Sequence, residues 1–176
     1  PHIFAENEYD LFFAQGYFTA FDRLWQMEFQ TYAAAGRISE IIGSKALSYD
    51  QYQRRIGMVF AAENALIKTK EHPKVYAGIE AYADGVNAYI QSLSWDQYPL
   101  EYKILDYKPE IWTPLKTLLF LKSMAFSLSG RSFDLDYNKL WDKIGMNELN
   151  DLYPQFPNYL DPVIPKNTQF SNSSIS

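Results

Sequence analysis

The residue types that carry hydrolytic or metal chemistry are present in this 176-residue chain, but they are scattered. His2 and His72, its two histidines, have neither a nucleophile nor an acid at a recognisable spacing, which argues against a Ser-His-Asp site built from these residues alone. The absence of cysteine excludes thiolate nucleophiles, disulfides and cysteine-bound metals within the chain. Neither a glycine-rich phosphate loop nor an HExxH motif is found. The sequence therefore predicts no catalytic residue and no organic cofactor in this chain.

Some carboxylates stand out because their neighbours are apolar or small. Asp22 and Arg23, inside an aromatic segment, are interpreted as a partly buried ion pair that fixes helix packing. Residues 84–87 (DGVN) indicate a close helix contact that needs glycine and one polar side chain. Asp134 and Asp136 fit two interpretations: partners of a helix dipole, or hard oxygen ligands for Ca²⁺ at a loop.

The elements that position these side chains are predicted to be helices. Asn7 can cap a long helix that stops at Gly36. Its apolar residues recur at three- and four-residue steps, which predicts one buried face: Leu11, Ala14, Phe18, Phe21, Trp25, Phe29 and Tyr32. Residues 48–51 have the capping-box pattern, which predicts a helix to about residue 69.

Further helices are predicted over residues 73–93, from Thr113-Pro114 to about 128, over 133–144 and over 146–153. Alternating strand patterns are nearly absent, so the fold class is mostly α. A helical domain over residues 1–153 is expected, followed by a tail over 154–176 that is first proline-rich and then polar. Such a tail buries too little apolar surface to order itself, and is interpreted as a linker or processed end.

Charge and composition exclude some partners. The net charge is −5 and there is no run of Lys or Arg, which argues against nucleic-acid binding. The sequence lacks a stretch of about 20 apolar residues, which argues against a membrane span. Aromatic residues make up 17% of the chain, and this excess hints at a surface that packs against another polypeptide.

Seven segments, in this order and spacing, resemble the α subunit of the penicillin acylase family of N-terminal-nucleophile hydrolases. They are PHI (1–3), DLFFAQGY (10–17), DRLWQME (22–28), GRISE (36–40), YADGVNAY (82–89), PLEY (99–102) and PEIWTP (109–114). The resemblance covers roughly residues 1–136, and its specificity comes from DLFFAQGY, DRLWQME and YADGVNAY taken together.

The resemblance implies one part of an αββα heterodimer whose β-sandwich lies largely in the other chain. A precursor would cleave itself, its spacer lying near the tail over 154–176, and the β subunit would then begin with Ser, Thr or Cys, usually Ser. That hydroxyl, with its own α-amine as base, would hydrolyse the amide bond between an acyl group and an amine. Expected substrates are small acylated amides such as β-lactam side chains or acyl-homoserine lactones, and the expected location is periplasmic or secreted.

The resemblance also assigns binding roles. Met124, Ser127 and Leu128 fall on the helix that forms one wall of the acyl pocket, where Ser127 replaces an Arg and Leu128 a Phe of penicillin G acylases. These departures permit an aliphatic acyl group. Judged without the resemblance, Met124 and Leu128 are ordinary core residues. Asp134 matches an acidic Ca²⁺ ligand of the family, which implies a structural Ca²⁺ whose other ligands come mostly from the β subunit.

Two other hypotheses remain open. A helical binding or scaffold module without chemistry would also explain the lack of a complete site. A family member that has lost its activity is the third possibility, because the decisive residues would lie on another chain.

Overall fold

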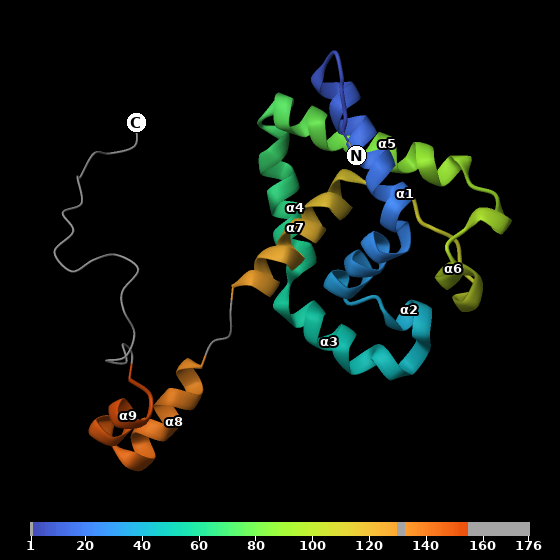
Figure 1. The fold of residues 1–176 in the computed structure, drawn as a ribbon. Helices are drawn as coiled ribbons and strands as arrows, with labels where there is room; N and C mark the ends of the chain where they lie inside the picture. The colour runs from blue at the N-terminus through green and yellow to red at the C-terminus, as the bar shows by residue number, and fades with distance from the viewer. Residues whose placement is uncertain (1, 130–132, 155–176) are drawn as a thin grey trace, which may run out of the picture. The chain divides into compact units, whose positions relative to one another are not determined.

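The computed structural model describes residues 2–129 and 133–154, which are helical and contain no strand, as predicted (Figure 1). The chain divides into two compact units, Pro1–Gly130 and Arg131–Ser176. The first unit contains α1 (Glu8–Ala35), α2 (Ser39–Ile42), η1 (Gly43–Ala46), α3 (Leu47–Ile56), α4 (Met58–Lys70), α5 (Pro73–Ser92), η2 (Trp95–Gln97), α6 (Leu100–Leu105) and α7 (Pro114–Leu128). The second contains α8 (Asp134–Ile144) and α9 (Met146–Leu152).

Helix ends follow the predicted caps in most places. The side chain of Asn7 accepts a hydrogen bond from the Asp10 amide at 2.9 Å, and α1 stops at Gly36 in the left-handed conformation. Thr113 caps α7, with Pro114 in its first turn. Helix α5 covers the predicted range almost completely.

The pairing of α1 with α5 is the most extensive helix contact in the first unit (Figure 1). It depends on two glycines, because a Cβ at Gly16 would lie 2.1 Å from the Tyr82 carbonyl oxygen, and one at Gly85 would lie 1.9 Å from that of Phe13. The two backbones therefore approach as closely as glycine allows. The close contact predicted for residues 84–87 is confirmed.

The predicted buried face of α1 is wrong in its first half. Phe18 is 46% exposed and Phe21 is 64% exposed, whereas Ala20, Leu24 and Met27 are buried. Small residues face α5 where the backbones lie closest. The Phe21 ring is largely exposed, although its edge still meets Tyr89 of α5 at 5.8 Å between ring centroids. In addition, Arg23 has non-helical dihedrals (φ −152°, ψ 39°), so that the helical phase changes at this residue.

The helix predicted over residues 48–69 is in fact two helices. Gly57 has a φ of 78° and divides α3 from α4, and no side-chain cap forms at the start of α3. Asp50 instead accepts hydrogen bonds from the amides of Ile38 and Ser39 at 3.0 and 2.7 Å. Burial alone would raise the pKa of Asp50, but the hydrogen bonds from Ser39 and Ile38 lower it below its ordinary value.

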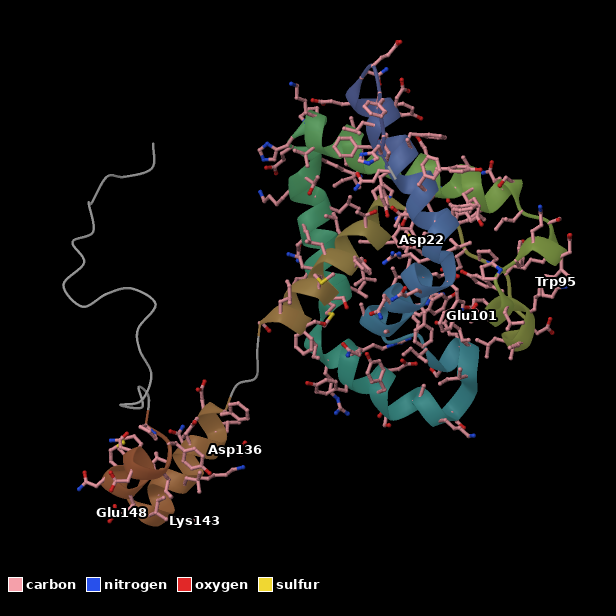
Figure 2. All side chains as sticks on the ribbon, in the orientation of Figure 1. Asp22, Trp95, Glu101, Asp136, Lys143 and Glu148 are labelled. Carbon is pink, nitrogen blue, oxygen red and sulfur yellow. The ribbon has the colours of Figure 1, made fainter. Side chains whose placement is uncertain are left out.

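The second unit consists of α8 and α9, which pack on each other. Asp136 and Lys143 lie on α8, and Glu148 lies on α9 (Figure 2). The tail predicted over 154–176 lies, from residue 155 on, outside the described residues, so the 1–153 and 154–176 division stays a prediction. Within the described ranges, every helix is too short or too polar to cross a membrane.

Candidate functional site

The three predicted acyl-pocket residues lie together at the C-terminal end of α7. Met124 is 46% exposed, Leu128 is 77% exposed, and Ser127 between them is also exposed. Met124 and Leu128 are an i,i+4 pair, so they share one face of the helix. The structure therefore contradicts the alternative that these two are ordinary core residues of this chain. They line neither of the two cavities described below.

Asp134, the predicted Ca²⁺ ligand, is the exposed first residue of α8. Within residues 2–129 and 133–154, no three His, Asp or Glu side chains come together in a way that could hold a metal ion. Ca²⁺ takes six to eight oxygen ligands, so the described residues do not by themselves fit such a site. The predicted Ca²⁺ remains a prediction that depends on ligands from elsewhere.

A groove of about 820 Å³ lies between α1, α5 and α7. Its apolar lining comes chiefly from Phe18, Phe21 and Met27 of α1, Tyr82 of α5, Trp112, and Phe120 of α7. We call this cavity the α1–α7 groove.

The pair Asp22–Arg23 also lines the α1–α7 groove (Figure 2 labels Asp22 on α1). Both Nε and Nη2 of Arg23 donate to one carboxylate oxygen of Asp22. The two side chains are 56% and 61% exposed, so the prediction of a partly buried pair is wrong. Because the two charges neutralise each other locally, the groove offers little net charge to a ligand.

A second cavity of about 550 Å³ lies where α1 meets α5. Leu11, Phe12, Val75 and Ile79 contribute its apolar lining. It shares Gln15, Tyr82 and Thr117 with the α1–α7 groove, so the two cavities adjoin each other.

A partly buried ionic cluster, which the sequence did not predict, is centred on Glu28. Glu28 is 1% exposed, and its carboxylate accepts hydrogen bonds from the Tyr102 hydroxyl and the Glu110 amide, both at 2.6 Å. The Nζ of Lys116 lies 3.5 Å from Glu28 and 2.9 Å from Glu110. Arg37 donates to the other oxygen of Glu110 at 2.7 Å.

The cluster shifts the two carboxyl pKa values in opposite directions. Burial raises the pKa of Glu28, although the hydrogen bonds from Tyr102 and from the Glu110 amide oppose the shift. The Arg37 guanidinium lowers the pKa of Glu110 to about 2, against a smaller effect of burial and with help from Lys116.

This arrangement holds the segment between α6 and α7 on the helices. Glu28 binds the backbone of Glu110, and Asn87 of α5 binds both the amide and the carbonyl of Trp112, at 2.7 and 2.9 Å. The indole nitrogen of Trp112 donates to Thr117 at 2.9 Å. These contacts fix Trp112 as a wall of the groove. They are structural contacts, and none of the serine or threonine hydroxyls among them is hydrogen-bonded to a histidine.

The clue in the sequence was Glu28 itself, an acid in the largely apolar run LWQMEF. Its partners Tyr102 and Glu110 are 74 and 82 residues away, so no local spacing could identify them.

One known protein family matches almost the whole chain. The family model of penicillin amidase matches residues 1–175. The chain belongs to the penicillin amidase family. The resemblance expected from the seven segments is thereby confirmed.

Curated relatives are named as acylases. The acyl-homoserine lactone acylase QuiP of Pseudomonas aeruginosa is 32% identical over 158 residues, which cover 89% of this chain and 18% of that protein. Penicillin G acylase of Escherichia coli is 27% identical over 173 residues, 94% of this chain and 20% of that protein. Penicillin acylase 2 proenzyme of a Pseudomonas species is 32% identical over 83% of this chain and 18% of that protein. The chain thus spans about a fifth of the length of these relatives.

A solved structure has the same fold. A chain of the thermostable penicillin G acylase from Alcaligenes faecalis matches with a TM-score of 0.72 and 23% identity. The match covers 97% of this chain and 92% of that chain. The helical fold of this chain is therefore one that occurs in a penicillin G acylase.

Proposed function

We propose that this chain is the α-subunit part of an amidohydrolase that cleaves the amide bond between an acyl group and an amine. The observation that carries the proposal is the family match over residues 1–175 in a chain that spans about a fifth of its acylase relatives. The solved chain of similar length supports a separate subunit. Water is consumed, the amide C–N bond breaks, and the products are a carboxylic acid and an amine.

The nucleophile is assigned to the remainder of the protein. Two observations support this. The two histidines of the chain have no nucleophile and acid at a recognisable spacing. One relative is named a proenzyme, which fits a polypeptide that is processed. An N-terminal Ser, Thr or Cys on a β subunit, activated by its own α-amine, would supply the chemistry without a histidine. Residues of this chain would bind the acyl group and position the partner.

The proposed acyl-binding surface is the exposed face formed by Met124, Ser127 and Leu128. Its apolar side chains are uncovered here, which supports a role in contact with a substrate or partner. Leu128 is smaller than a phenylalanine and leaves room for an aliphatic chain. The substrate class is a small acylated amide, with β-lactam side chains and acyl-homoserine lactones as the two candidates that the names of the relatives offer.

Two finer assignments belong to the same proposal. Asp134 contributes one oxygen to a structural Ca²⁺ whose remaining ligands lie outside the described residues. The mature protein acts in the periplasm or outside the cell.

The test is intact-mass and N-terminal analysis of the complete gene product, followed by hydrolysis assays. A second, larger chain that begins with Ser, Thr or Cys, together with release of free amine from acylated amides, is the expected result. A product that contains no such chain and releases no amine would favour a helical binding or scaffold module. A processed but inactive protein would indicate a family member that has lost its activity.

A further inference from the structure

Helix α7 is packed into the protein by its first half, while its second half carries the proposed acyl-binding face (Figure 1). Leu118 and Leu119, each 5% exposed, join one hydrophobic cluster with residues of α1 and α4. From Leu121 onward the large apolar side chains of α7 are exposed, and Leu128 at its end is 77% exposed. The place of the acyl-binding end therefore depends on how the first half of the helix is held.

Lys116, in the first turn of α7, joins the helix to two carboxylates on other segments. Its side chain is 12% exposed, and its Nζ lies 3.5 Å from Glu28 of α1 and 2.9 Å from Glu110, which precedes α7. Glu28 is held in turn by the Tyr102 hydroxyl, which donates to it at 2.6 Å. Glu110 is held by Arg37, which donates to it at 2.7 Å. One point on α7 is therefore joined to two fixed charges on two different segments.

Apolar packing restrains α7 less strictly than these charges do. Hydrophobic contact is non-directional, so Leu118 and Leu119 would keep most of their burial if the helix turned slightly or slid along its axis. Charge pairs and hydrogen bonds depend on distance and direction, so the same movement would separate Lys116 from one of its two carboxylates. The charges therefore select one placement of the helix among those that the apolar contacts allow.

We propose that Lys116 is a positioning residue for the acyl group. Through its two carboxylate partners it sets the rotation and height of α7, and thereby the place at which Met124 and Leu128 meet the substrate. This inference rests on the proposed function. At a rise of about 1.5 Å per residue, Leu128 lies about 18 Å along the helix from Lys116. A continuous helix carries a rotation from one end to the other, and a misplacement of about 1 Å can change a rate about a hundredfold.

The first test measures acyl preference in the complete, processed enzyme. It compares kcat/KM for two amides, one with a short and one with a long acyl chain, in Lys116→Met and Lys116→Arg. Methionine has nearly the length of lysine but no charge, so α7 can turn, and the ratio of the two kcat/KM values should change about tenfold or more. Arginine keeps a cation beside both carboxylates, so the ratio should stay within about threefold of wild type. The ratio does not depend on how much enzyme is folded, so lost stability alone leaves it unchanged.

Asp50→Asn is the matched control for a lost buried charge. Asp50 is a carboxylate of the same unit, 2% exposed, whose hydrogen bonds go to Ile38 and Ser39 at the start of α2. This variant should lose stability and keep the ratio within about threefold of wild type, because α7 keeps its anchor. An equal change of the ratio in Asp50→Asn and Lys116→Met would overturn the proposal. So would a Lys116→Met enzyme in which both rates fall by one common factor.

The second test measures the position of the helix directly. Lys116→Met leaves Glu28 without its cation, so the double variant Glu28→Gln/Lys116→Met, which lacks both charges, is the better-folded protein without the anchor. Crystal structures of the wild-type enzyme and of this double variant, superposed on α1 and α5, should differ by about 1 Å or more at residues 124–128. The double variant should also show the changed ratio. An unmoved α7, or a moved α7 with an unchanged ratio, would overturn the proposal.

Hydrolysis by the wild-type enzyme tests the proposed function separately. If the wild type releases no amine from either amide, the proposed function fails, and the position of α7 in the double variant still decides whether Lys116 is an anchor. If the wild type hydrolyses both amides and α7 does not move in the double variant, the role of Lys116 fails alone.

Discussion

At the scale of single residues, the stability of the first unit depends on how Glu28 is compensated in its buried position. Its carboxylate has a hydroxyl and an amide donor, and Lys116 is the cation nearest to it among the described ion pairs. We expect Lys116→Met to cost about 3 kcal/mol in the free energy of unfolding, because a buried carboxylate is then left without its cation. Urea denaturation of the assembled protein measures this loss.

The control is Lys139→Met, because Lys139 pairs with Asp136 on the surface at 3.8 Å with both side chains about three-quarters exposed. Such a pair contributes about 0–1 kcal/mol. The double variant Glu28→Gln/Lys116→Met should be less destabilised than Lys116→Met alone, because both charges are then absent. If the double variant had a lower free energy of unfolding than Lys116→Met, the unpaired charge of Glu28 would not explain the destabilisation by Lys116→Met.

The opposite pKa shifts of Glu110 and Glu28 predict two separate pH effects on stability. Glu110, with a pKa of about 2 against an ordinary 4.5, stabilises the fold above about pH 4.5, and this contribution is lost as the pH falls toward 2. Glu28 has a raised pKa, so its protonation as the pH falls toward 4.5 relieves a penalty and favours the fold. In Glu110→Gln, the free energy of unfolding should therefore fall less steeply as the pH drops below 4.5. In Glu28→Gln, the free energy of unfolding should no longer rise as the pH falls toward 4.5 from above.

Chemical denaturation at a series of pH values from 2 to 7 tests both variants. The wild type serves as reference, and each variant should differ in slope within its own pH window. Parallel curves for all three proteins would show that neither carboxyl has a shifted pKa in the folded state.

At the scale of elements, the α1–α5 pair is limited by backbone contact. Gly85→Ala would place a Cβ 1.9 Å from the Phe13 carbonyl oxygen, so one helix must move. We expect a loss of about 3 kcal/mol or more in the free energy of unfolding. Gly78→Ala on the same helix is the matched control, because its Cβ would meet the ring edge of Phe12 at 3.0 Å. That ring can shift, and the helix gains about 1 kcal/mol from alanine. Equal losses in the two variants would contradict the backbone clash.

Sequence patterns predicted the elements well because their signals are local. Asn7, Gly36 and Thr113 act within a few residues of the ends that they mark, and the structure has caps at all three. The buried face of α1 could not be predicted in the same way, since it depends on a distant glycine, Gly85, and on a change of phase at Arg23. A period of 3.6 residues identifies a face, but it does not say which neighbour covers that face.

The assignment of the candidate acyl-binding residues stays a prediction. Met124, Ser127 and Leu128 came from the family resemblance, and the structure shows them together on one exposed helix end. The α1–α7 groove was not predicted, because its lining is drawn from α1, α5, α7 and the segment that contains Trp112. Residues that meet only through tertiary packing leave no spacing in the sequence.

At the scale of the whole molecule, both units carry exposed large apolar side chains, which supports the proposed role of the chain as one part of a larger enzyme. In the second unit, Leu135 and Trp141 of α8 are 74% and 50% exposed. Large exposed apolar side chains often mark a surface that meets another polypeptide. In the proposed function the C-terminal end of α7 contacts the acyl group, so a change there should act on substrate preference and not on assembly.

This division of roles predicts how Leu128→Ala behaves in the complete enzyme. Loss of three side-chain carbons widens the acyl surface, so kcat/KM should shift by about tenfold toward longer or bulkier acyl groups, as expected for a change of a few methylenes in an apolar pocket. Self-processing, followed by the mass of the two chains, should change much less. Leu100→Ala, which truncates a leucine of α6 that is 66% exposed, is the control and should leave acyl preference unaltered. If Leu128→Ala and wild type show equal rate ratios across a series of acyl lengths, Leu128 does not contact the acyl group. If Leu100→Ala changes the rate ratios as strongly as Leu128→Ala does, the change in acyl preference is not specific to Leu128. It would then result from the loss of exposed apolar area, on α6 or on α7, and so from altered assembly.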